Sequence, residues 1–134
     1  MSARFLLDTN IVSDLMRHPQ GAVQAAIAKA GETSIATSVI VAAELRYGAL
    51  KQGSARLSAR VEAILNALDV LSFDAPADAH YGRIRADLHR RGQLIGPNDL
   101  LIAAHALALN LTLVTDNERE FSRVAGLKTE NWLR

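Results

Sequence analysis

The stretch Phe5–Asn10 reads FLLDTN and joins a short apolar run to an acid and two small polar residues. Residues Arg4–Leu7 predict a buried strand, because the apolar run is continuous and too short for a helix. Asp8 follows this strand and precedes an expected helix at Ile11–Met16. In an open α/β sheet the carboxyl ends of the strands form the ligand crevice. Because aspartate is also a favoured helix N-cap, Asp8 by itself supports capping as well as ligand binding.

Composition limits the kind of protein that the chain can form. Of its 134 residues, 49% are hydrophobic and 22% are charged, which predicts one soluble globular domain over residues 1–134. The net charge of +1 means that any basic surface for nucleic acid must be local. The chain has no cysteine, which excludes disulfides, thiolate metal sites and a cysteine nucleophile. With no apolar run near the roughly 20 residues of a membrane span and no signal-peptide core, we expect a cytoplasmic protein without a membrane partner.

Strand and helix patterns alternate along the rest of the chain. Further strands are expected at residues 33–37, 70–73, 112–115 and 127–132. Helices are expected at residues 39–47, 56–68, 77–91 and 99–110, with an amphipathic segment after Gly21 and a polar break between Gly48 and Gly53. Ser38 and Asn98 are candidate helix caps. This alternation predicts a single α/β domain with a parallel sheet flanked by helices.

Glu44 is the one acid in an otherwise apolar segment, residues 38–45. A helix that is apolar all round is expected to be buried, and burying an ionised carboxylate without a partner is very costly. Glu44 therefore either lies at a crevice or forms a salt bridge with a neighbour such as Arg46.

Two further acids stand at element boundaries. Asp99 opens the apolar helix behind a Gly-Pro-Asn turn, where the helix dipole alone would favour a carboxylate. Asp116 directly follows the expected strand 112–115, the same topological position as Asp8, although turn chemistry alone explains an Asp-Asn pair.

Taken together, these carboxylates are all able to reach one edge of a parallel sheet. Three or four carboxylates in a small space raise each other's pKa, and a bound cation removes that repulsion. Oxygen-only ligands favour Mg²⁺ or Mn²⁺ over zinc, and such acidic clusters hold metals for phosphodiester hydrolysis.

Other site chemistries find little support in the sequence. His105 lies about 240° around the helix from Asp99, and all four histidines are interpreted as structural or solvated. The chain contains no phosphate-binding Gly-x-x-x-x-Gly-Lys loop, no dinucleotide fingerprint and no Gly-x-Ser-x-Gly elbow. Basic residues gather at Arg83–Arg91 and at Lys51–Arg60, where they form either an ordinary solvated surface or contacts to a phosphate backbone.

Four motifs, in order along nearly the whole chain, resemble the PIN domain, and above all the VapC-type ribonuclease toxins of bacterial toxin–antitoxin pairs. The motifs are Leu6-Leu7-Asp8-Thr9-Asn10, Ala43-Glu44-Leu45 with Gly48, Asn98-Asp99 followed by Ile102–Ala106, and Leu113-Val114-Thr115 with Glu120-Phe121.

The resemblance implies a Mg²⁺- or Mn²⁺-dependent endoribonuclease built on a five-stranded parallel sheet. Asp8, Glu44 and Asp99 match the family's metal-site acids, so they are the expected catalytic and metal-binding residues. The resemblance also implies an RNA substrate, a toxin homodimer, and a higher hetero-oligomer with a small antitoxin whose N-terminal part binds DNA.

The fourth family position departs from the common pattern. Many PIN domains have Thr-x-Asp there, whereas this chain has Thr115-Asp116-Asn117. In the family register Asn117 faces the metal and Asp116 faces outward or caps the next turn; a slip of one residue exchanges these roles. Either residue is a candidate to support a second ion or a water molecule.

The favoured interpretation is thus the RNA-cleaving toxin of a type II toxin–antitoxin pair. One alternative is a non-catalytic PIN-like RNA-binding or scaffold domain. Another is a phosphatase of the haloacid-dehalogenase type, which requires Asp-x-Asp after the first strand where this chain has Asp8-Thr9-Asn10.

Overall fold

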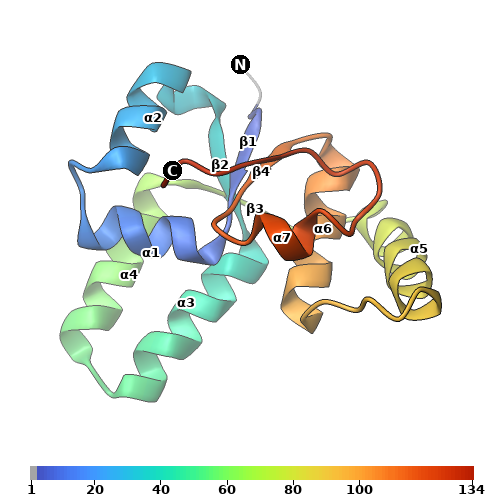
Figure 1. Ribbon diagram of the computed structural model, residues 1–134. Coiled ribbons are helices and arrows are strands. Elements are labelled where there is room, and N and C mark those ends of the chain that lie inside the picture. Colours follow the sequence, from blue (N-terminus) through green and yellow to red (C-terminus); the bar gives the residue numbers. More distant parts are fainter. Residues whose placement is uncertain (1–2) are drawn as a thin grey trace.

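A computed structural model describes residues 3–134 and contains one five-stranded sheet between groups of helices (Figure 1). Its strands are β1 (Phe5–Leu7), β2 (Ile35–Ser38), β3 (Asp69–Leu71), β4 (Thr112–Val114) and β5 (Thr129–Glu130). All neighbouring strands pair in parallel, in the order β3-β2-β1-β4-β5. The expected parallel five-stranded sheet is confirmed.

The helices pack on both sides of this sheet. They are α1 (Thr9–Arg17), α2 (Ala22–Ala30), α3 (Val39–Gln52), α4 (Ala55–Ala67), α5 (Ala77–Arg90), α6 (Pro97–Leu109) and α7 (Glu118–Phe121), with a 3₁₀ turn at Glu32–Ser34. In Figure 1, α1, α2 and α4 lie to the left of the strands, α5 and α6 lie to the right, and α3 runs below them. These helices cover a core formed largely by aliphatic side chains, with Leu6, Leu7 and Leu113 fully buried.

The register of the central strands aligns their carboxyl ends. Leu7 of β1 pairs with Thr37 of β2 and with Val114 of β4, and the backbone N–H of Asp8 donates to the Val114 carbonyl at 2.9 Å. Residues that follow these strands therefore meet at one edge of the sheet, as expected for parallel strands.

Helix α3 is longer and more exposed than its sequence indicates. It continues through Gly48 to Gln52 and ends at Gly53, whose left-handed φ of 67° suits glycine. The expected break at Gly48 is wrong, because packing against α4 supports the helix beyond it. The expectation of burial all round is also wrong, since one side of α3 exposes Tyr47 and Leu50. Ser38 is confirmed as the N-cap, accepting a hydrogen bond from the Ile40 N–H at 3.0 Å.

The start of α6 also differs from the prediction. Its N-cap is Gly96, and Pro97 occupies the first turn, where the missing proline N–H costs nothing. Asn98 is consequently inside the helix, and its side chain is free to reach another element instead of capping this one.

His105 of α6 is a buried residue of the interior. Its Nδ1 lies 2.8 Å from the Ser38 hydroxyl, and its ring packs edge-on against Phe73 with the ring centroids 5.4 Å apart. Burial lowers the pKa of His105 and so keeps the ring neutral. Among residues 3–134, no helix combines the length and apolar character needed to cross a membrane.

Candidate functional site

Asp8 is held in place at the end of β1 by two hydrogen bonds. It is 5% exposed and caps α1, where one carboxylate oxygen accepts from the Thr9 N–H at 2.8 Å. The other oxygen accepts from the Thr115 hydroxyl at 2.7 Å. Burial raises the pKa of Asp8, the two hydrogen bonds oppose that rise, and the charge of Glu44 adds to it. Asp8 therefore caps α1 and also belongs to the candidate site.

Glu44 points from the middle of α3 toward the same edge of the sheet. One of its oxygens accepts from the Thr9 hydroxyl, and the other accepts from the Asn98 amide at 3.2 Å. Arg46, the candidate partner for Glu44, instead forms a salt bridge of 2.9 Å with Glu62 of α4. Glu44 therefore faces the crevice, oriented by uncharged donors from α1 and α6.

Asp99 lies in the first turn of α6 and is half-buried. Its pKa is raised from 3.8 to about 6, first by burial and then by the charges of Asp8, Glu44 and Glu120. An aspartate at a helix N-terminus would ordinarily be stabilised in its charged form. The opposite shift indicates that burial and the neighbouring carboxylates together outweigh the helix dipole here.

Glu120 is a member of this acidic group that the sequence interpretation left without a role. It lies in α7, and its carboxylate accepts from the Asn117 side-chain amide at 2.6 Å. The prediction considered residues directly after strand β4, whereas the helical turn at 118–121 brings forward a residue six positions beyond the strand. The pairing of Glu120 with Phe121, which is fully buried and anchors α7, is the sequence signal that marks it.

Asp116 and Asn117 point to different parts of the molecule. Asp116 accepts a hydrogen bond from Asn131 at 3.0 Å and forms a salt bridge of 3.3 Å with Arg134, both in the C-terminal segment. The backbone N–H of Asn117 donates to the Thr115 hydroxyl at 3.0 Å. Asn117 is therefore connected through Thr115 to Asp8, while Asp116 is engaged away from the acids.

The donor set fits a hard divalent cation. Within residues 3–134, no lysine or arginine forms a salt bridge with Asp8, Glu44, Asp99 or Glu120. The repulsion among these four carboxylates is therefore not neutralised by a basic side chain. Carboxylate oxygens are the ligands that Mg²⁺ and Mn²⁺ prefer. In the described part of the chain, no three acidic, histidine or cysteine side chains stand close enough together to hold a metal ion between them. The fit thus rests on charge and donor type.

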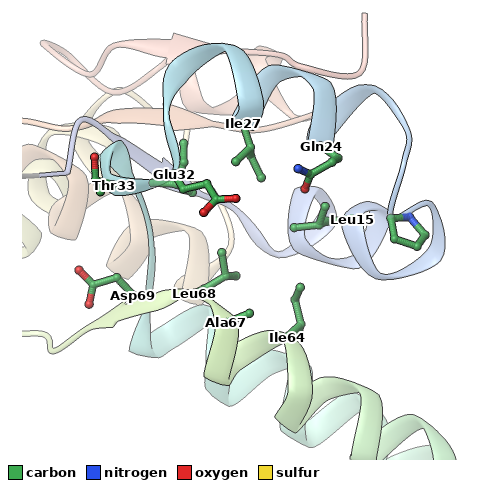
Figure 2. Close-up of a pocket in the computed structure, with 11 residues that line it drawn as sticks. Leu15, Gln24, Ile27, Glu32, Thr33, Ile64, Ala67, Leu68 and Asp69 are labelled. Carbon is green, nitrogen blue, oxygen red and sulfur yellow. The ribbon is translucent and has the colours of Figure 1, made fainter.

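A separate pocket of about 610 Å³ lies at the other end of the strands (Figure 2). Leu15 of α1, Ile27 of α2 and Ile64 of α4 line it, together with Ile35 and Asp69, which begin β2 and β3. Because the four acids stand at the carboxyl ends, this pocket is not part of the acidic site.

Comparison with known proteins agrees with this fold. Residues 5–127 match the model of the PIN domain. The chain belongs to the PIN-domain family. Ribonuclease VapC2 of Rickettsia felis is 41% identical over 130 residues, 96% of this chain and 97% of the relative. The tRNA(fMet)-specific endonuclease VapC of Shigella flexneri is also 41% identical over 130 residues, 96% of this chain and 98% of that protein.

The chain is similar in structure to chains of solved complexes named VapBC. The Rickettsia felis VapBC2 complex, bound to a DNA fragment from its promoter, contains a chain with a TM-score of 0.87 and 37% identity, covering 96% of this chain and 98% of that one. The DNA-bound VapBC complex of Salmonella typhimurium gives a TM-score of 0.89 at 37% identity, covering 97% and 98%. The chain is thus a PIN-domain protein of the VapC type.

Proposed function

We propose that this chain is the toxin of a type II toxin–antitoxin pair and cleaves RNA internally by hydrolysis that depends on Mg²⁺ or Mn²⁺. One observation carries the proposal: in a VapC-type chain, Asp8 and Glu44 meet the first turn of α6 at the carboxyl edge of the sheet, where burial and the charges of Asp8, Glu44 and Glu120 raise the pKa of Asp99 to about 6. A site with this excess of negative charge is built to receive a cation before it receives a phosphodiester.

In this proposal Asp8 and Asp99 bind the principal metal ion. Asp8 presents its oxygens in one fixed orientation, because Thr9 and Thr115 hold its carboxylate. A carboxylate that is already ordered loses little conformational entropy when it binds a metal ion, which favours binding. Glu44 completes the ligand set or orients the attacking water, with Thr9 and Asn98 fixing its carboxylate.

Glu120 is proposed as the fourth acid, positioned by Asn117. When bound at these acids, a divalent ion would supply positive charge to activate water and stabilise the phosphate oxygens. Hydrolysis then adds water across one phosphodiester bond and yields a phosphate monoester and a hydroxyl group. The charge that the acids share, rather than any single carboxylate, sets the affinity for the ion.

The partners follow from the relatives. Because the similar solved chains come from VapBC complexes bound to DNA, we propose a small antitoxin with a DNA-binding N-terminal part, a toxin homodimer and a higher hetero-oligomer, all in the cytoplasm. Because the Shigella flexneri relative is named tRNA(fMet)-specific, tRNA(fMet) is the first RNA substrate to test.

Cleavage of RNA by purified protein tests the proposal. Asp8→Asn, Glu44→Gln, Asp99→Asn and Glu120→Gln should each lower the cleavage rate. We expect a loss of about 100-fold or more where the carboxylate binds the metal ion directly, and of about 10-fold or more where it orients another ligand or the water. EDTA should abolish cleavage by the wild type, and Mg²⁺ or Mn²⁺ should restore it.

Glu62→Gln is the matched control, because Glu62 is an exposed acid of α4 that forms a salt bridge with Arg46 of α3. Its cleavage rate should equal that of the wild type. A wild-type protein that binds RNA but never cleaves it, at any metal concentration, would identify the chain as a non-catalytic RNA-binding domain instead.

A further inference from the structure

A cleft of about 580 Å³ opens beside Glu44, between α3 and the start of α6. Its lining includes Thr9 and Asn98, the two residues that donate to the Glu44 carboxylate. Ile40, Ala43, Tyr47 and Leu101 complete the lining. One wall of this cleft is therefore part of the acidic site, and the opposite wall is apolar and aromatic.

Tyr47 is the exposed aromatic residue of this cleft. Its side chain is 65% exposed, and within residues 3–134 its hydroxyl has no hydrogen-bond partner. The other Tyr and the Trp are engaged: Tyr81 accepts a hydrogen bond from Arg85, and Trp132 packs on Phe5. Tyr47 thus offers an open ring face at the acidic site.

Tyr47 lies three residues after Glu44 on the same helix. Residues separated by three positions in a helix are neighbours on its surface, with about 5–6 Å between their Cβ atoms. A phosphodiester at the acids therefore brings the base of an adjacent nucleotide next to Tyr47. Proteins that bind single-stranded RNA commonly stack unpaired bases on aromatic side chains.

We propose that Tyr47 stacks on the base of a nucleotide next to the scissile phosphodiester and so positions unpaired RNA for cleavage. This inference rests on the proposed ribonuclease function. In this proposal the α3 wall of the cleft holds a base, whereas the carboxylates hold only the metal ion.

A second copy of the chain is the competing occupant. Val39, Tyr47 and Leu50 are all exposed on α3, and an uncovered apolar helix face also suits a protein partner. A partner seated over Tyr47 would, however, lie across the cleft that leads to Glu44. The position of Tyr47 within the acidic cleft favours RNA over a permanent protein contact.

Binding and cleavage by Tyr47 variants test the proposal. Tyr47→Ala and Tyr47→Leu should raise KM for RNA by roughly 5- to 100-fold with little change in kcat, the loss expected for one stacked base. Tyr47→Phe and Tyr47→Trp should stay within about 3-fold of the wild type, because their rings still stack. Leu50→Ala, on the same exposed side of α3 but outside the cleft lining, is the matched control and should leave KM unchanged.

A fluorescence measurement adds a readout that is independent of cleavage. In an Asp8→Asn background with Mg²⁺, RNA hairpins carry 2-aminopurine at one loop position at a time. One position should be quenched on binding when residue 47 is aromatic, and the quenching should disappear in Tyr47→Ala. Equal quenching and equal KM in Tyr47→Ala would overturn the inference while leaving the ribonuclease function standing.

The mass of each variant by light scattering separates the two occupants. A Tyr47→Ala variant that halves in mass, and whose KM is restored at high protein concentration, would assign this face to a second copy and overturn the inference. If the wild type cleaves no RNA with any divalent ion, the ribonuclease function itself fails and the inference fails with it.

Discussion

At the scale of single residues, Thr115 connects the two ends of the acidic site. Its hydroxyl donates to Asp8 and accepts from the Asn117 N–H, so a buried side chain just after β4 orients both residues. Asp116, which lies between Thr115 and Asn117 in the sequence, is turned toward Asn131 and Arg134. Direction of the side chain, not distance along the chain, separates the roles of residues 116 and 117.

Variants at these two positions should therefore behave differently. Asp116→Asn should keep cleavage within about 3-fold of the wild type and cost at most about 1 kcal/mol of stability, the value of an exposed ion pair. Asn117→Asp places a carboxylate beside Glu120 in place of an amide donor, so it should lower the melting temperature in EDTA and strengthen Mn²⁺ binding.

Titration of both variants with Mn²⁺, followed by thermal melting, provides the measurement. A loss of activity in Asp116→Asn comparable to that in Asp8→Asn would contradict this assignment and place Asp116 at the metal.

At the scale of elements, the first turn of α6 supplies two side chains of the candidate site at once. Asn98 reaches Glu44 and Asp99 joins the other acids, because Gly96 and Pro97 begin the helix two residues earlier than a cap at Asn98 would. A Cβ on Gly96 would lie 3.3 Å from Asp99 Oδ2, so this glycine leaves room for the carboxylate.

Gly96→Ala is expected to disturb the site more than the fold. The φ of Gly96 is −56°, which alanine adopts without strain, so stability should change by no more than about 0.5 kcal/mol. Displacement of the Asp99 carboxylate should weaken metal binding by about 10-fold. The concentration of Mg²⁺ that gives half-maximal cleavage measures this effect.

Gly82→Ala in α5 is the matched control, because a Cβ there meets no atom within 4 Å. It should leave the metal dependence unchanged and stabilise the helix by about 0.5–1 kcal/mol. If Gly96→Ala and the wild type require the same Mg²⁺ concentration, the glycine has no role in seating Asp99.

At the scale of the whole molecule, the parallel sheet and its connections bring together acids from residues 8, 44, 99 and 120. Each element is short, and no segment contains more than one of these carboxylates. Folding thus assembles a negative cluster that the unfolded chain does not have, and the metal-free protein bears its cost.

Asp99→Asn should accordingly stabilise the metal-free protein. The folded pKa of Asp99, about 6, is above its ordinary value of 3.8, so the folded state binds the proton more tightly. Stability is therefore gained below the unfolded pKa and lost as pH rises from about 4 through 6. The full difference corresponds to about 3 kcal/mol, which solvent around the half-buried side chain screens to about 1 kcal/mol.

Thermal melts in EDTA between pH 4 and pH 8 check this expectation. Asp99→Asn should melt about 3 °C above the wild type at pH 8, and the gap should close toward pH 4. Adding Mg²⁺ or Mn²⁺ should raise the melting temperature of the wild type far more than that of the variant. A variant that melts below the wild type at pH 8 in EDTA would show that Asp99 is not repelled by its neighbours.

Local sequence was sufficient for the fold class and for three of the acids in the candidate site. The run FLLDTN, the Ser38 cap and the alternation of strands with helices are short-range signals, since propensity and periodicity act over a few residues. They predicted the parallel sheet, placed Asp8 and Asp99 at element boundaries, and marked Glu44 as the one acid within an otherwise apolar helix.

Long-range packing was needed for the rest. Contact with α4 carries α3 past Gly48, and the turn after β4 directs Asp116 to the C-terminal segment while α7 presents Glu120 to the acids. Asn98 became a partner of Glu44 instead of a cap. The directions of the Asp116, Glu120 and Asn98 side chains depend on elements distant in sequence. Because successive residues in a helix point about 100° apart, an error of one residue in a helix boundary reassigns the role of a side chain.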